Sequence, residues 1–83
     1  STEYFILNKL EDGYKLNLLN SWNKETIPTI IEEIKSLKFH PNKKMYIDFQ
    51  DLKELDSIAI IYLISFLKKF KIIIFFCSLS KLG

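Results

Sequence analysis

Residues 44 to 77 read KMYIDFQDLKELDSIAIIYLISFLKKFKIIIFFC, and this stretch decides the fold. At its start, Met45, Ile47 and Phe49 alternate with other side chains, which predicts a strand over residues 44 to 49 with these three facing inward. At its end, the continuous apolar run over residues 71 to 77 predicts a strand covered on both faces, as in a parallel sheet. Between them, residues 57 to 70 predict a helix, so the three segments together form a right-handed βαβ unit.

The segments before this unit predict a β-hairpin followed by a helix. Residues 3–10 and 14–19 carry strand-forming side chains, and Glu11-Asp12-Gly13 between them is a turn signal. In the second of these strands Tyr14, Leu16 and Leu18 share one face, and Lys15 and Asn17 share the other, which we expect to be wet or partly covered. The helix starts near Glu25 or Thr26, with Pro28 in its first turn and one apolar stripe. That stripe is formed by Ile27, Ile30, Ile31, Ile34 and Leu37.

These segments predict an α/β fold with the order ββαβαβ, in which helices pack on a mixed four-stranded sheet. The 83 residues fit a single domain spanning 1–83. If the last strand is covered on both faces, a further helix should follow it, and residues 78 to 83 are too short to form one. We therefore expect a domain that is truncated at its C-terminus and lacks its C-terminal helix.

Composition narrows the class of protein. The net charge of +2 is too balanced to indicate nucleic-acid binding. No basic segment followed by an apolar core marks a signal peptide. Cys77 is the only cysteine, which rules out an intrachain disulfide and favours a reducing compartment. Residues 57 to 79 are very apolar, but Lys68, Lys69 and Lys71 interrupt them, so we expect no membrane span in this segment.

The helix over residues 57 to 70 carries apolar residues on the side that should face water. A helical wheel places Lys68 and Lys69 on the solvent side. The core side is predicted to hold Ala59, Ile60, Leu63, Phe66, Leu67 and Phe70; the solvent side holds Ser57, Ile58, Ile61, Tyr62 and Ser65. Such a cluster is either a partner interface, incidental exposure, or a surface covered by a missing C-terminal element. We interpret Ile58, Ile61, Tyr62 and Ser65 as a partner interface.

Asp56 and Ser57 stand at the start of this helix, and both residue types are favoured N-caps. Either residue could therefore be the cap. The functional alternative is phosphorylation of Ser57, because a phosphate there would meet the positive end of the helix dipole. It would also add negative charge beside Asp56 and alter the apolar surface next to it.

The strand YIDF, the loop after it and the helix LDSIAIIYLISFL resemble a STAS domain, the fold of anti-sigma factor antagonists. The resemblance covers about half of the chain. It implies that Ser57 matches the regulatory phosphorylation site and that Asp56 matches the preceding Asp. At the positions where the family often has Ser-Gly, this chain has Ile58 and Ala59.

A second segment, LLNSWNKET at residues 18 to 26, is similar to the Gly-x-Trp segment in STAS domains of Mla-type lipid ABC transporters. Trp22 matches the Trp, and Asn20 stands where the Gly usually is. The resemblance implies a non-catalytic regulatory module that is a separate subunit or the N-terminal part of the permease. We therefore expect a protein partner, the transporter ATPase or the permease, at the cytoplasmic face of the membrane. The alternative is an anti-sigma factor antagonist whose partner is a kinase; a homodimer is a further arrangement.

No other constellation indicates chemistry. His40 and Cys77 are single and far apart in sequence, so we expect no metal site and no cofactor; His40 fits a helix end and Cys77 a buried small apolar residue. Ser57 has no nearby histidine base, so nucleophilic catalysis is not expected. An acidic loop could hold a cation, but a solvated loop is the favoured interpretation. Its carboxylates are Asp48, Asp51, Glu54 and Asp56.

Overall fold

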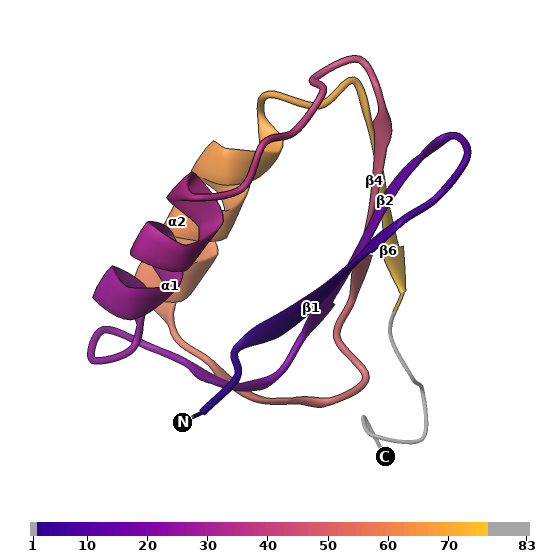
Figure 1. Ribbon diagram of the computed structural model, residues 1–83. Coiled ribbons are helices and arrows are strands. Elements are labelled where there is room, and N and C mark those ends of the chain that lie inside the picture. The colour runs from indigo at the N-terminus through magenta and orange to yellow at the C-terminus, as the bar shows by residue number, and fades with distance from the viewer. Residues whose placement is uncertain (1, 77–83) are drawn as a thin grey trace.

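The computed structural model describes residues 2 to 76 and places a four-stranded sheet beside two helices (Figure 1). The elements in chain order are β1 (Phe5–Lys9), β2 (Gly13–Leu18), β3 (Asn20–Trp22), α1 (Ile27–Lys35), β4 (Lys44–Asp48), β5 (Leu52–Leu55), α2 (Ser57–Leu67) and β6 (Ile72–Phe76). The main sheet has the order β1-β2-β4-β6. The pair β1-β2 is antiparallel, whereas β2-β4 and β4-β6 are parallel. The predicted α/β class, the mixed four-stranded sheet and the order of its strands and helices are confirmed.

The β1-β2 hairpin is closed by the predicted turn, in which the Leu10 N–H donates to the Gly13 carbonyl at 2.8 Å. Gly13 also begins β2, where it pairs with Lys44 of β4. A Cβ at this position would collide with the backbone carbonyl of Lys44. Glycine is therefore required at position 13, because the backbone of β4 passes so closely.

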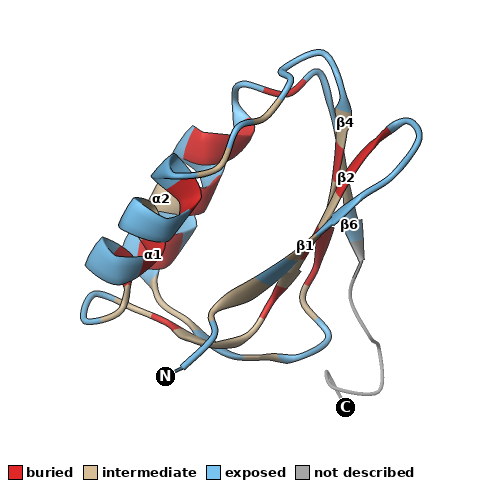
Figure 2. Cartoon of the chain, viewed as in Figure 1, coloured by how far each residue is buried: buried red, intermediate tan, exposed pale blue. Residues whose placement is uncertain are grey.

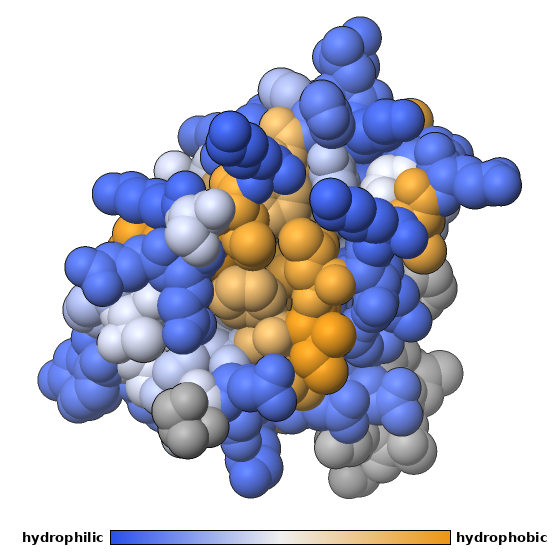
Figure 3. Space-filling model, in the orientation of Figure 1, coloured by the Kyte–Doolittle hydropathy of each residue, from blue (hydrophilic) through white to orange (hydrophobic). Residues whose placement is uncertain are grey.

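Both helices cover the same face of the sheet, and the core lies between these two layers (Figures 1 and 2). β2 contributes Tyr14, Leu16 and Leu18 to this core, as its alternation predicted, and β4 contributes Met45 and Ile47. The buried residues of the helices are Ile27, Ile30, Ile34, Ala59, Leu63, Phe66 and Leu67. Phe49, predicted to face inward, is half-buried and packs against the core. In Figure 3 apolar side chains are visible between the helical layer and the sheet, framed by polar ones.

The prediction that the last strand is covered on both faces is wrong for the described part of the chain. β6 lies at one edge of the sheet, with Ile72 and Phe75 exposed and Ile73 and Ile74 half-buried. A continuous apolar run is compatible with an edge strand as well as with a central one, because both place side chains on two faces. Cys77, predicted to be buried, lies outside the described residues.

A second, two-stranded sheet was not predicted from the sequence. β3 pairs in parallel with β5, so that Trp22 lies opposite Leu55. The two strands have only three and four residues, and neither alternates apolar with polar side chains. Asn20 opens β3 with a φ of 61°, a left-handed conformation that Asn tolerates better than most residues. Asn20 is the residue that stands in place of the glycine when residues 18 to 26 are compared with the Gly-x-Trp segment.

Within residues 2 to 76, neither helix is long and apolar enough to cross a membrane.

Candidate functional site

The start of α2 is fixed by Asp56, which the structure identifies as the N-cap. Its backbone is extended, and its Oδ1 accepts a hydrogen bond from the Ala59 N–H at 2.9 Å. Its Oδ2 accepts from the Lys24 N–H at 2.9 Å, which ties the start of α2 to the segment before α1. Its own N–H donates to the Trp22 carbonyl at 3.0 Å. Both carboxylate oxygens and the backbone of Asp56 therefore hold the first turn of α2 in place.

Ser57, the first residue of α2, is exposed. Because Asp56 serves as the cap, the Ser57 hydroxyl is not needed for capping. Within residues 2 to 76, this hydroxyl makes no hydrogen bond with another residue. The choice left open by the sequence is thereby settled in favour of Asp56. The hydroxyl of Ser57 is accessible from solvent at the positive end of the helix dipole.

Trp22 lies directly beneath this junction. Its side chain is fully buried, and its Nε1–H donates to the Tyr4 carbonyl at 2.8 Å. Its backbone belongs to the β3-β5 pair and accepts the hydrogen bond from Asp56. Trp22 thus joins the N-terminal segment, the small sheet and the start of α2. The sequence indicated Trp22 only through the resemblance; in the structure its side chain fills the core, and its backbone carbonyl accepts the hydrogen bond from Asp56.

The outward surface of α2 is rich in isoleucine. We call it the isoleucine face, and its exposed fractions are 48% for Ile58, 41% for Ile60, 68% for Ile61 and 54% for Ile64. Ser57 and Ser65 are exposed beside these residues. Four large apolar side chains that gather on one helix differ from the isolated exposed apolar residues that most protein surfaces carry.

The predicted positions of Ile58, Ile61 and Ser65 on the solvent side of α2 agree with the structure, but two details differ. Ile60 was placed in the core, and this is wrong: it lies about 80° around the wheel from the centre of the buried stripe. Tyr62 is half-buried rather than exposed, and this burial raises the pKa of its hydroxyl above the ordinary 10.0. Tyr62 lines a cleft of about 550 Å³ between α1 and α2, together with Ile34, Leu37 and Phe66. Ile64 extends the exposed apolar surface and was not singled out from the sequence.

Three of the four carboxylates of the predicted acidic loop have separate structural roles, and the fourth, Asp51, is exposed. Asp48 is buried; it accepts hydrogen bonds from the Asn17 side chain and the Gln50 N–H and lies 3.7 Å from the Lys15 Nζ. Glu54 accepts from the Asn23 side chain at 2.8 Å, whereas Asp56 caps α2. No group of three potential metal-ligating side chains gathers among residues 2 to 76.

Comparisons of the chain with protein-family models, with curated proteins and with solved structures found no match. The surface that stands out by its geometry is the isoleucine face of α2, which begins at the firmly capped Asp56-Ser57 junction.

Proposed function

We propose that this chain is a non-catalytic interaction module that docks on a partner protein through the isoleucine face of α2. The observation that carries the proposal is the exposure of Ile58, Ile60, Ile61 and Ile64 on one helix. Clustered apolar side chains with a polar surround are typical of protein interfaces. Interfaces of this kind depend on a few central residues, and Ile61, the most exposed of the four, is the best candidate.

The face is suited to docking because α2 is rigidly placed. Asp56 fixes its first turn, and Ala59, Leu63, Phe66 and Leu67 anchor its opposite side in the core. A partner would therefore meet a preformed surface and would not have to order it on binding, which lowers the cost of association.

We further propose, from the resemblance of residues 18 to 26 and 46 to 67, that the partner is a subunit of an Mla-type lipid ABC transporter. The ATPase subunit is the partner that we expect from this resemblance. Docking on it would place the chain at the cytoplasmic face of the membrane. In this role the chain would stabilise the transporter or set its activity without catalysing a reaction itself.

The test is co-purification of the 83-residue chain with the ATPase subunit of such a transporter. We expect the unmodified chain to be retained and Ile61→Asp to lose the partner. Ile6→Asp is the matched control, since Ile6 is 45% exposed but lies on β1. The proposal fails if the ATPase is not retained by the unmodified chain, or if both variants bind it equally well.

A second candidate is an anti-sigma factor antagonist that is switched by phosphorylation of Ser57. One observation favours it: the Ser57 hydroxyl is exposed and is not used for capping. A phosphate there would add about −1.5 to −2 charge beside Ile58 and Ile61, which would oppose docking through an apolar surface.

This alternative predicts that an anti-sigma factor kinase with ATP adds one phosphate to the chain. Mass spectrometry should place it on Ser57, and Ser57→Ala should abolish it. Ser65→Ala is the control, because Ser65 is an exposed serine on the same helix. Unchanged mass, or modification of Ser65 instead, would refute the alternative.

A further inference from the structure

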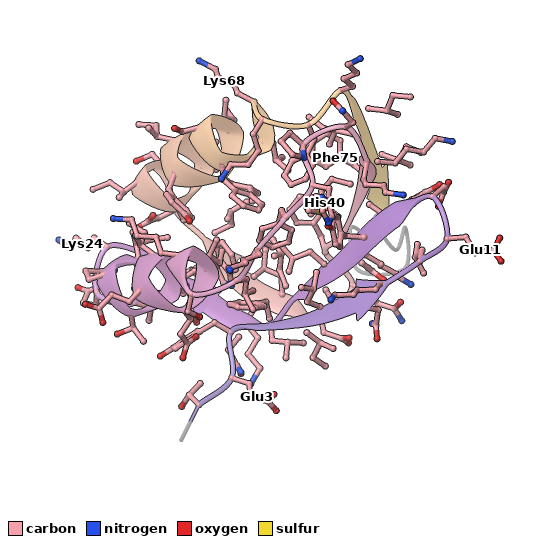
Figure 4. The ribbon with its side chains drawn as sticks, turned by 45° about the horizontal axis from the view of Figure 1, so that its top comes forward. Glu3, Glu11, Lys24, His40, Lys68 and Phe75 are labelled. Atoms are coloured by element: carbon pink, nitrogen blue, oxygen red, sulfur yellow. The ribbon has the colours of Figure 1, made fainter. Side chains whose placement is uncertain are left out.

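Charge is distributed unevenly between the two ends of the sheet. Three connections lie at the end where β2, β4 and β6 begin: the hairpin at residues 9 to 13, the α1-β4 connection at 36 to 44, and the α2-β6 connection at 68 to 71. They share one end because Lys44 pairs with both Gly13 and Ile72 across the sheet. Figure 1 shows them together at the top, and Figure 4 turns this end forward and labels one residue of each, namely Glu11, His40 and Lys68. We call this the basic end.

The basic end carries seven lysines but only two carboxylates. The lysines are Lys9, Lys38, Lys43, Lys44, Lys68, Lys69 and Lys71, and the carboxylates are Glu11 and Asp12. The formal charge of this end is therefore +5, whereas the whole chain carries only +2. At the opposite end, residues 2 to 4, 19 to 26 and 49 to 56 carry five carboxylates and two lysines. The balanced net charge thus conceals a strongly bipolar domain.

Little of this positive charge is neutralised within the domain. Lys44 pairs with Asp12, with 3.4 Å between the Lys44 Nζ and the Asp12 Oδ2. The other six lysines form no ion pair with any residue that the structure describes. The dipoles of α1 and α2 favour lysines just after the helices, such as Lys38 and Lys68, but they do not account for Lys9 and Lys43.

Several of these lysines are presented by a well-anchored backbone. Phe39 packs edge-on against Tyr14, Phe66 and Phe70, with ring centroids 5.1 to 5.8 Å apart. The next residue, His40, donates its backbone N–H to the Tyr14 hydroxyl at 2.9 Å. Residues 38 to 43 are therefore held against the hairpin. A cleft of about 300 Å³ lies between them, and it is lined by Lys9, Leu10, Lys38, His40 and Lys43.

Two exposed aliphatic side chains stand among the lysines. Leu10 is 42% exposed at the hairpin, and Ile72 is 48% exposed where β6 begins. The phenylalanines of the three connections, Phe39 and Phe70, are half-buried and buried, so neither is free to stack on a base, and the imidazole of His40 is the one exposed aromatic ring there. The chain also contains no arginine. Lysines with aliphatic neighbours match an anionic bilayer surface, whereas nucleic-acid sites usually combine basic residues with arginine contacts and aromatic stacking.

From this combination we infer that the basic end binds the surface of an anionic lipid membrane. Lys9, Lys38 and Lys43 contact the headgroups, a headgroup phosphate occupies the cleft beside His40, and Leu10 and Ile72 reach below the headgroups. The isoleucine face of α2 uses none of these residues, so this inference does not rest on the proposed function. The two surfaces adjoin only at the end of α2, where Lys68 follows Ile64 by one turn, whereas Ile58 and Ile61 lie nearer the opposite end of the helix.

The experiment is co-sedimentation of the 83-residue chain with vesicles of phosphatidylcholine and phosphatidylserine in about a 2:1 ratio, beside vesicles of phosphatidylcholine alone. We expect binding to the anionic vesicles only, and its loss at about 0.5 M NaCl, where charges are screened within a few ångströms. Each lysine near such a surface strengthens binding about fivefold, so Lys38→Gln with Lys43→Gln should weaken it at least tenfold.

The matched control is Lys24→Gln with Lys53→Gln, which removes the same charge at the opposite end of the domain. It should leave vesicle binding within about twofold, because the domain extends over 30 Å and the Debye length is about 10 Å at 0.1 M salt. Equal weakening by the two pairs would show a net-charge effect and overturn the inference. So would the absence of vesicle binding at low salt, or binding of duplex DNA in place of vesicles with the same dependence on Lys38 and Lys43.

Discussion

Removal of the Asp56 carboxylate tests how the start of α2 is held. In Asp56→Ala the hydrogen bond from the Ala59 N–H is lost, and with it the cap of α2. Replacement of a capping Asp by Ala costs about 1 kcal/mol of stability. The hydrogen bond from the Lys24 N–H to the other carboxylate oxygen is also lost, at about 1 kcal/mol, because it lies at the surface. We therefore expect the free energy of unfolding to fall by about 2 kcal/mol.

Urea denaturation followed by circular dichroism measures this change, and Tm should fall by roughly 10 °C for a domain of this size. Asp51→Ala is the matched control, because Asp51 is an exposed carboxylate of the same loop; it should change stability by less than about 0.5 kcal/mol. Ser57→Ala should also be nearly neutral. If Asp56→Ala costs no more than Asp51→Ala, or if Ser57→Ala costs more than Asp56→Ala, the assignment of Asp56 as the cap is wrong.

Three further predictions concern other contacts. Trp22→Phe should lower the free energy of unfolding by about 2 kcal/mol in urea, because it leaves a cavity and an unpaired Tyr4 carbonyl; an unchanged midpoint would contradict the buried placement. Asn20→Ala should cost about 1 kcal/mol more than Asn20→Gly, since Gly adopts a φ of 61° without strain; the reverse order would be inconsistent with that conformation. The hydrogen bond from the Tyr46 hydroxyl, and to a lesser extent Lys44, holds the pKa of Asp12 below the ordinary 3.8. Tyr46→Phe should therefore raise the pKa of Asp12 in an NMR titration, whereas Tyr62→Phe should leave it unchanged. Because the folded pKa is the lower one, this contact stabilises the fold above about pH 3.8 and loses its effect as the pH falls through the folded pKa.

The main elements were predictable because their sequence patterns are strong. The alternation of Tyr14, Leu16 and Leu18 and the apolar stripe of α1 have clear periods. Tyr14, Leu16, Leu18, Ile27, Ile30 and Ile34 are buried as expected, whereas Ile31 and Leu37 of the stripe are only half-buried. The β3-β5 pair was not predictable, because strands of three and four residues carry too little pattern. Its formation depends on tertiary contacts, such as the burial of Trp22.

The site was predictable only in part. Ile58 and Ile61 could be placed on the surface because lysines mark the solvent side of α2. Ile60 was misplaced because α2 is apolar nearly all round, so its faces are poorly distinguished by hydropathy. The basic end could not be identified at all, since its lysines come from three connections that are distant in sequence and meet only in the folded sheet.

Docking through the isoleucine face of α2 can be tested residue by residue in solution. The experiment is an NMR titration of the ¹⁵N-labelled chain with the proposed partner, the ATPase subunit of an Mla-type lipid ABC transporter. The proposal predicts that the largest shift changes and line broadening fall on residues 57 to 65, and that Ile61→Asp abolishes them. Changes centred on β1 or on the open face of the sheet, with α2 unaffected, would show that the partner docks elsewhere.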